Sequence, residues 1–186
     1  IKQLSKPKAY LYQLLKKYQF TEWNNVLDLL TSQTGKQVFS KTHVLLKDRD
    51  FLILSEIPIK KKDSAYVEIL ETQSTISTPI FLNFEENSSE KITSKNSISV
   101  AKNLLKYPLI LRKWKNGDYF CPSGMQGKKK LSKYFKDEKI SLIEKEKIWL
   151  LCTAENEIIW VINHRQDRRF LANSATENRL QITYKS

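Results

Sequence analysis

The spacing of apolar residues changes about forty residues into the chain, and this change restricts the fold more than any other feature. Before that point, apolar residues recur three and four positions apart, which is the period of one face of an α-helix. After it they form short runs or alternate, as β-strands do. The chain is therefore predicted to be α+β, with a helical hairpin followed by short strands. The two helical sets are Leu11, Leu14, Leu15 and Tyr18, and Trp23, Val26, Leu27 and Leu30.

Residues that suit helix ends flank both sets. Ser5 and Pro7 favour a helix start just before the first set. Thr21 suits the N-cap of the second helix, and Gly35 suits its C-terminal end. The strands then begin with residues 42–57, in which two apolar runs flank a charged turn and predict a β-hairpin. Further short strands are expected at residues 66–70 and 79–84.

A polar, serine-rich stretch at residues 85–97 predicts a long loop or linker. A second unit is expected to begin near Pro108, so the predicted domains are residues 1–107 and 108–186. The second domain is expected to be small, compact and also α+β. Its expected elements are a strand at 109–114 ending in an Asn-Gly turn, a helix opened by Lys128–Lys130, a helix at 142–147, a strand, turn and strand within 148–163, and a last strand at 179–184.

Positive charge is concentrated in one part of the chain. The sequence has 32 Lys and Arg against 20 Asp and Glu, a net charge of +12, which attracts polyanions such as nucleic acid. Between Arg112 and Lys139, nine basic residues stand against three acidic ones, so half of the excess lies in 28 residues. This concentration favours a binding surface over charge that only maintains solubility.

Two basic clusters adjoin short loops, as expected for contacts to a phosphate backbone. In the first, Lys128–Lys130 follow a Gly124–Gly127 turn and are predicted to open a helix whose first-turn amides attract anions. The second holds three arginines that can donate from a forked guanidinium or stack on a nucleotide, with Asp167 placed to orient one of them. The candidate RNA-binding residues are Arg112, Lys113, Lys115, Lys128, Lys129, Lys130, Lys133, Lys139, Arg165, Arg168 and Arg169.

Structural roles explain some of these residues equally well. Lys136 and Lys139 can be solvated charges beside two acidic neighbours, and an ion pair with Asp167 explains the arginines as well as contact with nucleic acid does. The apolar residues that follow the lysine run most simply dock its helix on the core. They are Leu131, Tyr134 and Phe135.

The sequence lacks the residues of a nucleotide-binding or catalytic site. Its four glycines form neither a Walker loop nor a dinucleotide fingerprint. The two histidines and the two cysteines, Cys121 and Cys152, do not have metal-ligand spacing. No apolar run reaches the roughly 18 residues of a membrane span. We therefore expect no active site, cofactor or metal in this chain, a cytoplasmic location and no membrane partner.

Residues 109–184 resemble the C-terminal domain of the bacterial tRNA(Ile)-lysidine synthases. The likeness rests on "LRKWKNGDYFCPSGMQGKKKLSKYFKDEKIS", in which arginine, GD, F-x-P-x-GM and G-x-KKLS follow in the family's order, and on "IIWVINHRQDRRF". The earlier part, with its two helices, "TSQTGKQV" and the hairpin, is similar to the family's middle, substrate-binding domain. Two positions differ from the family pattern: Lys133 stands where an acidic residue is common, and Asn163 where glycine is common.

The resemblance implies a role in tRNA modification. In this family, an N-terminal domain with a glycine- and serine-rich loop uses ATP with magnesium to activate the wobble cytidine of an isoleucine tRNA with a CAU anticodon. Lysine then displaces AMP and leaves lysidine. The present chain has no such loop, so it is expected to be inactive alone. Its implied role is to hold the tRNA body, with the last domain at the acceptor stem, in partnership with the catalytic domain.

The resemblance also implies that Lys128–Lys130 face the acceptor-stem backbone, where recognition depends on shape, phosphates and 2′-hydroxyl groups. A different class of function is also consistent with the residues. In this alternative, the chain is a protein-interaction module whose basic patch docks an acidic partner or the catalytic domain itself. Little affinity of the chain for RNA at physiological salt would favour that second hypothesis.

Overall fold

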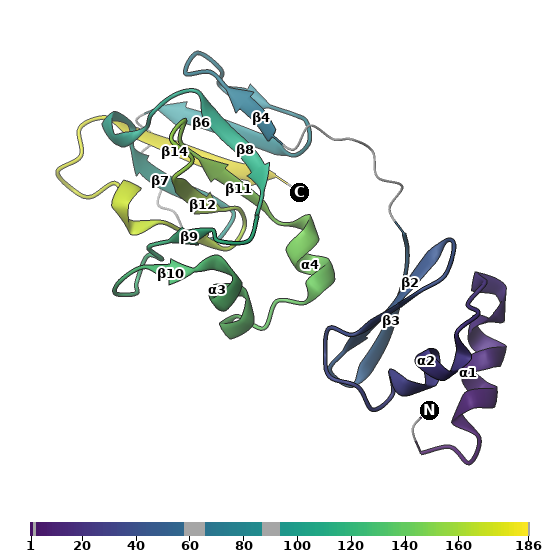
Figure 1. Ribbon diagram of the computed structural model, residues 1–186. Helices are drawn as coiled ribbons and strands as arrows, with labels where there is room; N and C mark the ends of the chain where they lie inside the picture. Colours follow the sequence, from purple (N-terminus) through teal and green to yellow (C-terminus); the bar gives the residue numbers. More distant parts are fainter. Residues whose placement is uncertain (2, 58–65, 87–93, 186) are drawn as a thin grey trace. The chain divides into compact units, whose positions relative to one another are not determined.

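The computed structural model describes residues 1, 3–57, 66–86 and 94–185. The chain forms two compact units, residues 1–62 and 63–186, each with its own hydrophobic core (Figure 1). No helix among the described residues is long and apolar enough to cross a membrane.

The first unit packs two short helices on a three-stranded antiparallel sheet. The predicted helical hairpin is present, with the rings of Tyr12 and Trp23 4.8 Å apart. Leu11 and Leu15 are buried, whereas Leu14 is exposed. The elements are α1 (Pro7–Leu15), the 3-10 turn η1 (Lys16–Tyr18), α2 (Trp23–Asp28), β1 (Gln37–Phe39), β2 (His43–Asp48) and β3 (Phe51–Glu56), with strand order β1-β2-β3.

Two predicted helix ends differ from the structure. The N-cap of α2 is Glu22, whose side chain makes no capping hydrogen bond, so Thr21 does not cap this helix. The helix ends at Asp28, and Gly35 lies in a later turn with φ of 101°, where its N–H donates to the carbonyl of Lys47. The glycine thus serves the start of the sheet and not the helix end.

The second unit contains three antiparallel sheets and two short helices. Its five-stranded sheet has the order β13-β12-β11-β8-β4, its four-stranded sheet the order β5-β6-β14-β7, and β9 pairs with β10. The elements are β4 (Tyr66–Ile69), β5 (Thr75–Ile76), β6 (Phe81–Glu86), β7 (Ser97–Ala101), η2 (Lys102–Leu104), β8 (Leu109–Lys113), β9 (Tyr119–Phe120), β10 (Lys129–Lys130), α3 (Leu131–Asp137), α4 (Leu142–Lys147), β11 (Trp149–Cys152), β12 (Ile158–Val161), β13 (Arg165–Gln166), η3 (Arg168–Phe170) and β14 (Arg179–Lys185).

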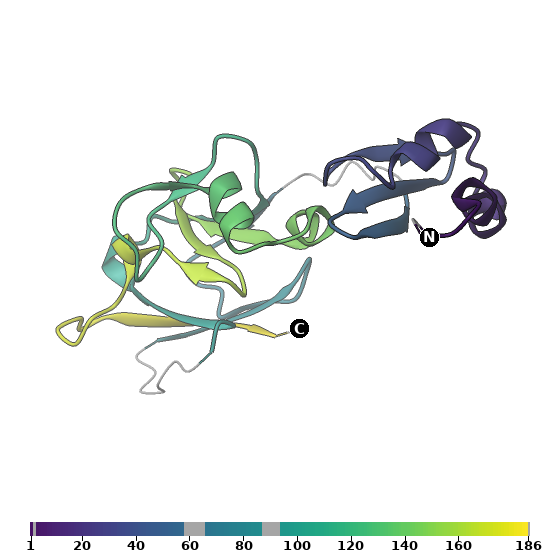
Figure 2. The same cartoon turned by 90° about the horizontal axis from the view of Figure 1, so that it is seen from below.

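The two larger sheets pack face to face around the main core of the second unit (Figure 2). Leu111 and Leu151 from one sheet and Leu82 and Ile182 from the other are each fully buried in it. The other face of the five-stranded sheet carries a second cluster, to which α3 contributes Leu131, Tyr134 and Phe135. Because β11 is covered on both faces, it reads as a continuous apolar run instead of an alternating one.

Most predicted elements of the second unit are present, and the α+β class is confirmed. Residues 87–93 of the predicted loop or linker at 85–97 lie outside the described residues, while its ends belong to β6 and β7. The compact units divide at residues 62 and 63, whereas the sequence predicts a domain boundary at 107 and 108. Strands β4, β6 and β7 precede Pro108 but pair with β8 and β14, which follow it.

Candidate nucleic-acid interface

The last two lysines of the run lie on a two-stranded ribbon, and Lys128 directly precedes it. Lys129 pairs with Phe120 and Lys130 with Tyr119, and the helix α3 begins only at Leu131. The turn that precedes the run contains two glycines with positive φ, Gly124 and Gly127. Lys130 is the N-cap of α3, so the lysine run leads into the predicted helix but does not form its first turn, because backbone pairing with β9 holds Lys129 and Lys130 extended.

Helix α3 anchors the ribbon to the core of the unit. Leu131, Tyr134 and Phe135 are fully buried, as their spacing predicted, and the ring of Tyr134 meets that of Phe120 edge-on at 5.1 Å. Burial raises the pKa of the Tyr134 hydroxyl. The opposite face of the helix exposes Lys133. A rigid, buried face therefore supports the exposed cations of this region.

The three consecutive lysines have different environments. Lys128 is exposed, and its Nζ lies 3.1 Å from the ring centroid of Tyr119, a cation–π contact. Lys129 forms an ion pair with Asp137 at 2.8 Å, and its hydrogen bond lowers the pKa of that carboxyl group. Lys130 is exposed and forms no ion pair with any described residue. Of the three, Lys128 and Lys130 are the cations that a ligand can reach.

Two candidate cations have partners within the protein, Arg112 at a buried position and Lys113 at a partly exposed one. Arg112 is buried and makes a two-pronged ion pair with Asp118 at 2.8 and 2.9 Å, while its Nε donates to Asn156. Asp118 also accepts from the backbone N–H of Lys115, which closes the turn before β9. Lys113 donates from Nζ to the carbonyl of Lys147 at 3.0 Å, and burial lowers its pKa. We therefore assign Arg112 and Lys113 structural roles.

The three arginines of the second basic cluster also differ in their environments. The Arg169 guanidinium donates to both oxygens of the buried Asp167, and these hydrogen bonds raise the pKa of the guanidinium. Arg169 also forms an ion pair with Glu157 at 2.6 Å. Arg165 is partly buried, donates to the carbonyl of Ser123 and lies 3.9 Å from Glu138. Arg168 is exposed, and its side chain has no hydrogen-bond partner among the described residues. The expectation that Asp167 orients one arginine is met by Arg169.

The two clusters are neighbours in space. Cys121 donates its N–H to the Asp167 carboxylate and accepts at its carbonyl from the N–H of Arg168, and Ser123 donates to the carbonyl of Gln166. The ribbon therefore lies beside the arginine segment. We call their exposed cations the basic surface: Lys115, Lys128, Lys130, Lys133, Lys139 and Arg168.

Sequence reasoning missed one aromatic member of this region. Tyr119 is 46% exposed, lies under Lys128 and is opposite Lys130 on the ribbon. Its alternation with the buried Phe120 after an Asn-Gly turn was the available signal. Asn163 stands where the resembling family commonly has glycine, and its backbone explains why asparagine fits there. This residue has φ of 61°, a conformation that asparagine tolerates better than most residues. Among the described residues, no cluster of His, Cys, Asp or Glu is arranged to hold a metal ion.

Comparisons with known proteins match both ends of the chain. Residues 1–57 match the family model described as the TilS substrate binding domain, and residues 109–182 match the TilS substrate C-terminal domain. A protein named tRNA(Ile)-lysidine synthase from Parabacteroides distasonis is 39% identical over 96% of this chain and 41% of its own length. One of the same name from Bacteroides thetaiotaomicron is 32% identical over 92% of this chain and 38% of its own.

A solved structure matches the fold. It is described as the crystal structure of a TILS C-terminal domain, has a TM-score of 0.51 at 21% identity, and covers 64% of this chain and 90% of its own. At this identity the match supports the fold alone. The chain itself spans about two fifths of the length of the curated relatives.

Proposed function

The chain belongs to the tRNA(Ile)-lysidine synthase family, of which it carries the substrate-binding and C-terminal domains, and we propose that these domains bind the tRNA substrate of such an enzyme. In this proposal the whole enzyme uses ATP with magnesium to join lysine to the wobble cytidine of an isoleucine tRNA with a CAU anticodon. The chemistry takes place in a catalytic domain outside this chain. The chain alone is inactive, and the whole enzyme is located in the cytoplasm.

The basic surface is the observation that carries the proposal. Lys128, Lys130 and Lys133 are exposed on a ribbon and a helix that the buried Leu131 and Tyr134 hold in place. Fixed cations on a rigid support can neutralise phosphates without losing much conformational freedom, and each neutralised phosphate releases counterions.

A duplex stem is the part of a tRNA that this surface suits best, and we propose the acceptor stem. The deep major groove of A-form RNA excludes side chains, so binding depends on phosphates, 2′-hydroxyl groups and shape. Lysines provide point charges for phosphates, and the exposed Tyr119 can pack on a ribose or a terminal base pair.

The test is a binding titration of the chain at several salt concentrations. One arm uses the isoleucine tRNA with the CAU anticodon, and the other uses an elongator methionine tRNA. We expect both to bind with steep salt dependence. A preference for the isoleucine tRNA that persists as salt rises would place part of the discrimination in these domains.

Matched variants connect the result to the basic surface. Changing Lys128 and Lys130 together to Ala should weaken binding and reduce the log–log salt slope by about 2, if each lysine meets one phosphate. The control removes two other lysines of the same unit, Lys102 and Lys185, and lowers the net charge equally. It should change the slope much less, because these residues lie at the four-stranded sheet.

Two outcomes contradict the proposal. Equal slopes for the two double variants would mean that only the total charge matters, which removes the basic surface from the explanation. Absence of RNA binding at physiological salt would instead favour the alternative, in which the basic surface docks an acidic protein or the catalytic domain.

A further inference from the structure

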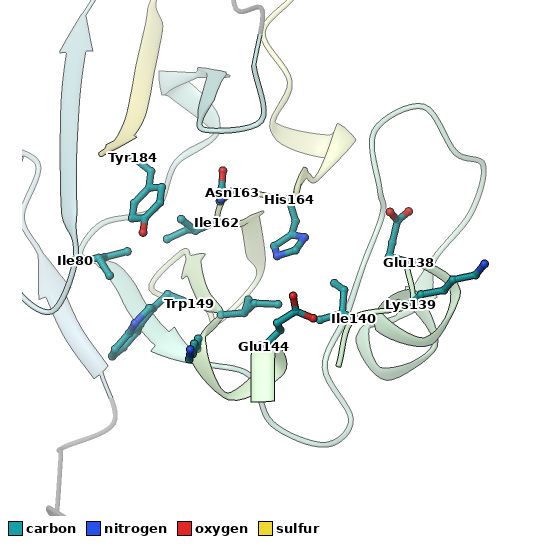
Figure 3. A pocket seen from close by; sticks show the side chains of 12 residues that line it. Ile80, Glu138, Lys139, Ile140, Glu144, Trp149, Ile162, Asn163, His164 and Tyr184 are labelled. Atoms are coloured by element: carbon teal, nitrogen blue, oxygen red, sulfur yellow. The ribbon is translucent and has the colours of Figure 1, made fainter. Parts of the chain in front are cut away.

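The second unit contains a pocket of about 450 Å³ beside α3 and α4 (Figure 3). Aromatic and aliphatic side chains form much of its wall, including Trp149 from β11, Tyr184 from β14 and Ile140. Its volume lies in the range of small-molecule sites, which are largely apolar with a few polar groups for orientation. Neither the basic surface nor the proposed stem contact explains it.

Three polar side chains of the pocket lack a hydrogen-bond partner among the described residues. They are the Asn163 amide, the His164 ring and the Tyr184 hydroxyl. Figure 3 shows the ring of His164 and the hydroxyl of Tyr184 pointing toward the pocket interior. Burial lowers the pKa of His164, so its imidazole is neutral at pH 7 and offers one donor and one acceptor. Flat rings and unused donors and acceptors are the groups that recognise a nucleobase.

The wall of the pocket carries charge of both signs, from Glu138, Glu144, Lys139 and Lys147. Glu138 and Glu144 belong to the wall, and their carboxylates disfavour a phosphate in the interior. Lys139 also lines the pocket, and Figure 3 shows its amine pointing away from the interior. Lys95 lies close enough to His164 to contribute to lowering its pKa. Cations outside the cavity can therefore meet the backbone of a nucleotide whose base enters it.

The pocket continues from the basic surface. Lys139 belongs to both, and Glu138 lies 3.9 Å from Arg165, which donates to the carbonyl of Ser123 between β9 and β10. We propose that the pocket receives one unpaired nucleotide of the RNA whose duplex contacts the basic surface. This inference rests on the proposed function and extends it, because it assigns the same domain a contact to single-stranded RNA.

The experiment compares three RNAs that share one stem: a blunt hairpin, the same hairpin with an unpaired 3′ overhang, and the same hairpin with a single-nucleotide bulge. The chain should bind the blunt RNA through the basic surface. One unpaired form should bind roughly 5- to 150-fold more tightly, the range expected from stacking of one base. The form that gains affinity identifies whether the nucleotide comes from an end or from within the stem.

Two variants test the pocket itself. His164→Ala and Tyr184→Phe should lose most of the gain from the unpaired nucleotide and leave binding of the blunt hairpin unchanged, which also demonstrates that they fold. Equal affinity of the unaltered chain for all three RNAs would overturn the inference and leave the proposed function intact. A uniform loss of affinity in both variants would also overturn it, whereas no binding of any RNA would overturn the proposed function.

Discussion

At the residue scale, basic residues close together in the sequence serve different purposes. Arg112 and Lys130 lie in one basic stretch, yet the first is buried against Asp118 and the second is exposed on the ribbon. A buried guanidinium is stable only when its donors are satisfied, whereas an exposed ammonium keeps its hydration and can exchange it for a phosphate. Charge counts along the sequence therefore overestimate the number of residues available to a ligand.

The ion pair of Arg112 predicts a large effect on stability. Changing Arg112 to Ala leaves the Asp118 carboxylate buried without its partner, and we expect a loss of about 3 kcal/mol in the free energy of unfolding. The salt dependence of RNA binding should change little. Chemical denaturation of both proteins measures the first quantity, and a salt titration measures the second.

Lys130→Ala is the matched control for that variant. It removes the same charge from an exposed position, so its free energy of unfolding should stay within about 0.5 kcal/mol of the original. If Arg112→Ala is no less stable than Lys130→Ala, the ion pair does not stabilise the fold and Arg112 returns to the set of candidate ligand contacts.

At the element scale, local patterns predicted most elements and failed where pairing is distant. The helix at 142–147 and the hairpin at residues 42–57 were predictable, since their apolar spacing and turns lie within a few neighbouring residues. The spacing of the buried residues predicts α3 but does not mark its first residue, so it does not show that Lys129 and Lys130 are extended. Pairing of Lys130 with Tyr119 decides this, and the sequence between them does not reveal it.

Helix α4 has a feature that decides its stability. The Ser141 hydroxyl accepts from the N–H of Glu144, and the Glu144 carboxylate accepts from the N–H of Ser141, a capping box. With only six residues and none of them fully buried, α4 depends on this cap. Changing Ser141 to Ala should lower the free energy of unfolding of the second unit by about 1 kcal/mol, as measured by denaturation.

Ser132→Ala provides the comparison for the cap. Ser132 is exposed in α3 and makes no side-chain hydrogen bond with the described residues. Because alanine has the higher helix propensity, this change should be neutral or slightly stabilising. A loss of stability as large as that of Ser141→Ala would show that the cap is not the cause.

At the scale of the whole molecule, two compact units organise the chain, the first with one hydrophobic core and the second with two. The core of the first unit lies within residues 11–54, and those of the second within residues 67–184. The polar stretch at residues 85–97 and the strand that begins near Pro108 predict a boundary at 107 and 108, but strands on both sides of it pair in the same sheets. Local composition indicates where loops lie, whereas the pairing of strands that are far apart in the sequence determines which residues belong to one compact unit. For the same reason, the pocket that joins Ile80, His164 and Tyr184 could not be found from the sequence.

Two compact units predict two unfolding transitions in calorimetry. The first unit is small and buries a smaller fraction of its surface, so it should unfold at the lower temperature. Leu29 and Leu82 are each fully buried, one in each unit. Leu29→Ala should lower the midpoint temperature of only the first transition, and Leu82→Ala that of only the second. In each case the cavity should reduce the free energy of unfolding of its unit by about 2–5 kcal/mol. If either change moves the whole trace together, the units fold as one, and RNA binding by the second unit must then be measured with the first unit intact.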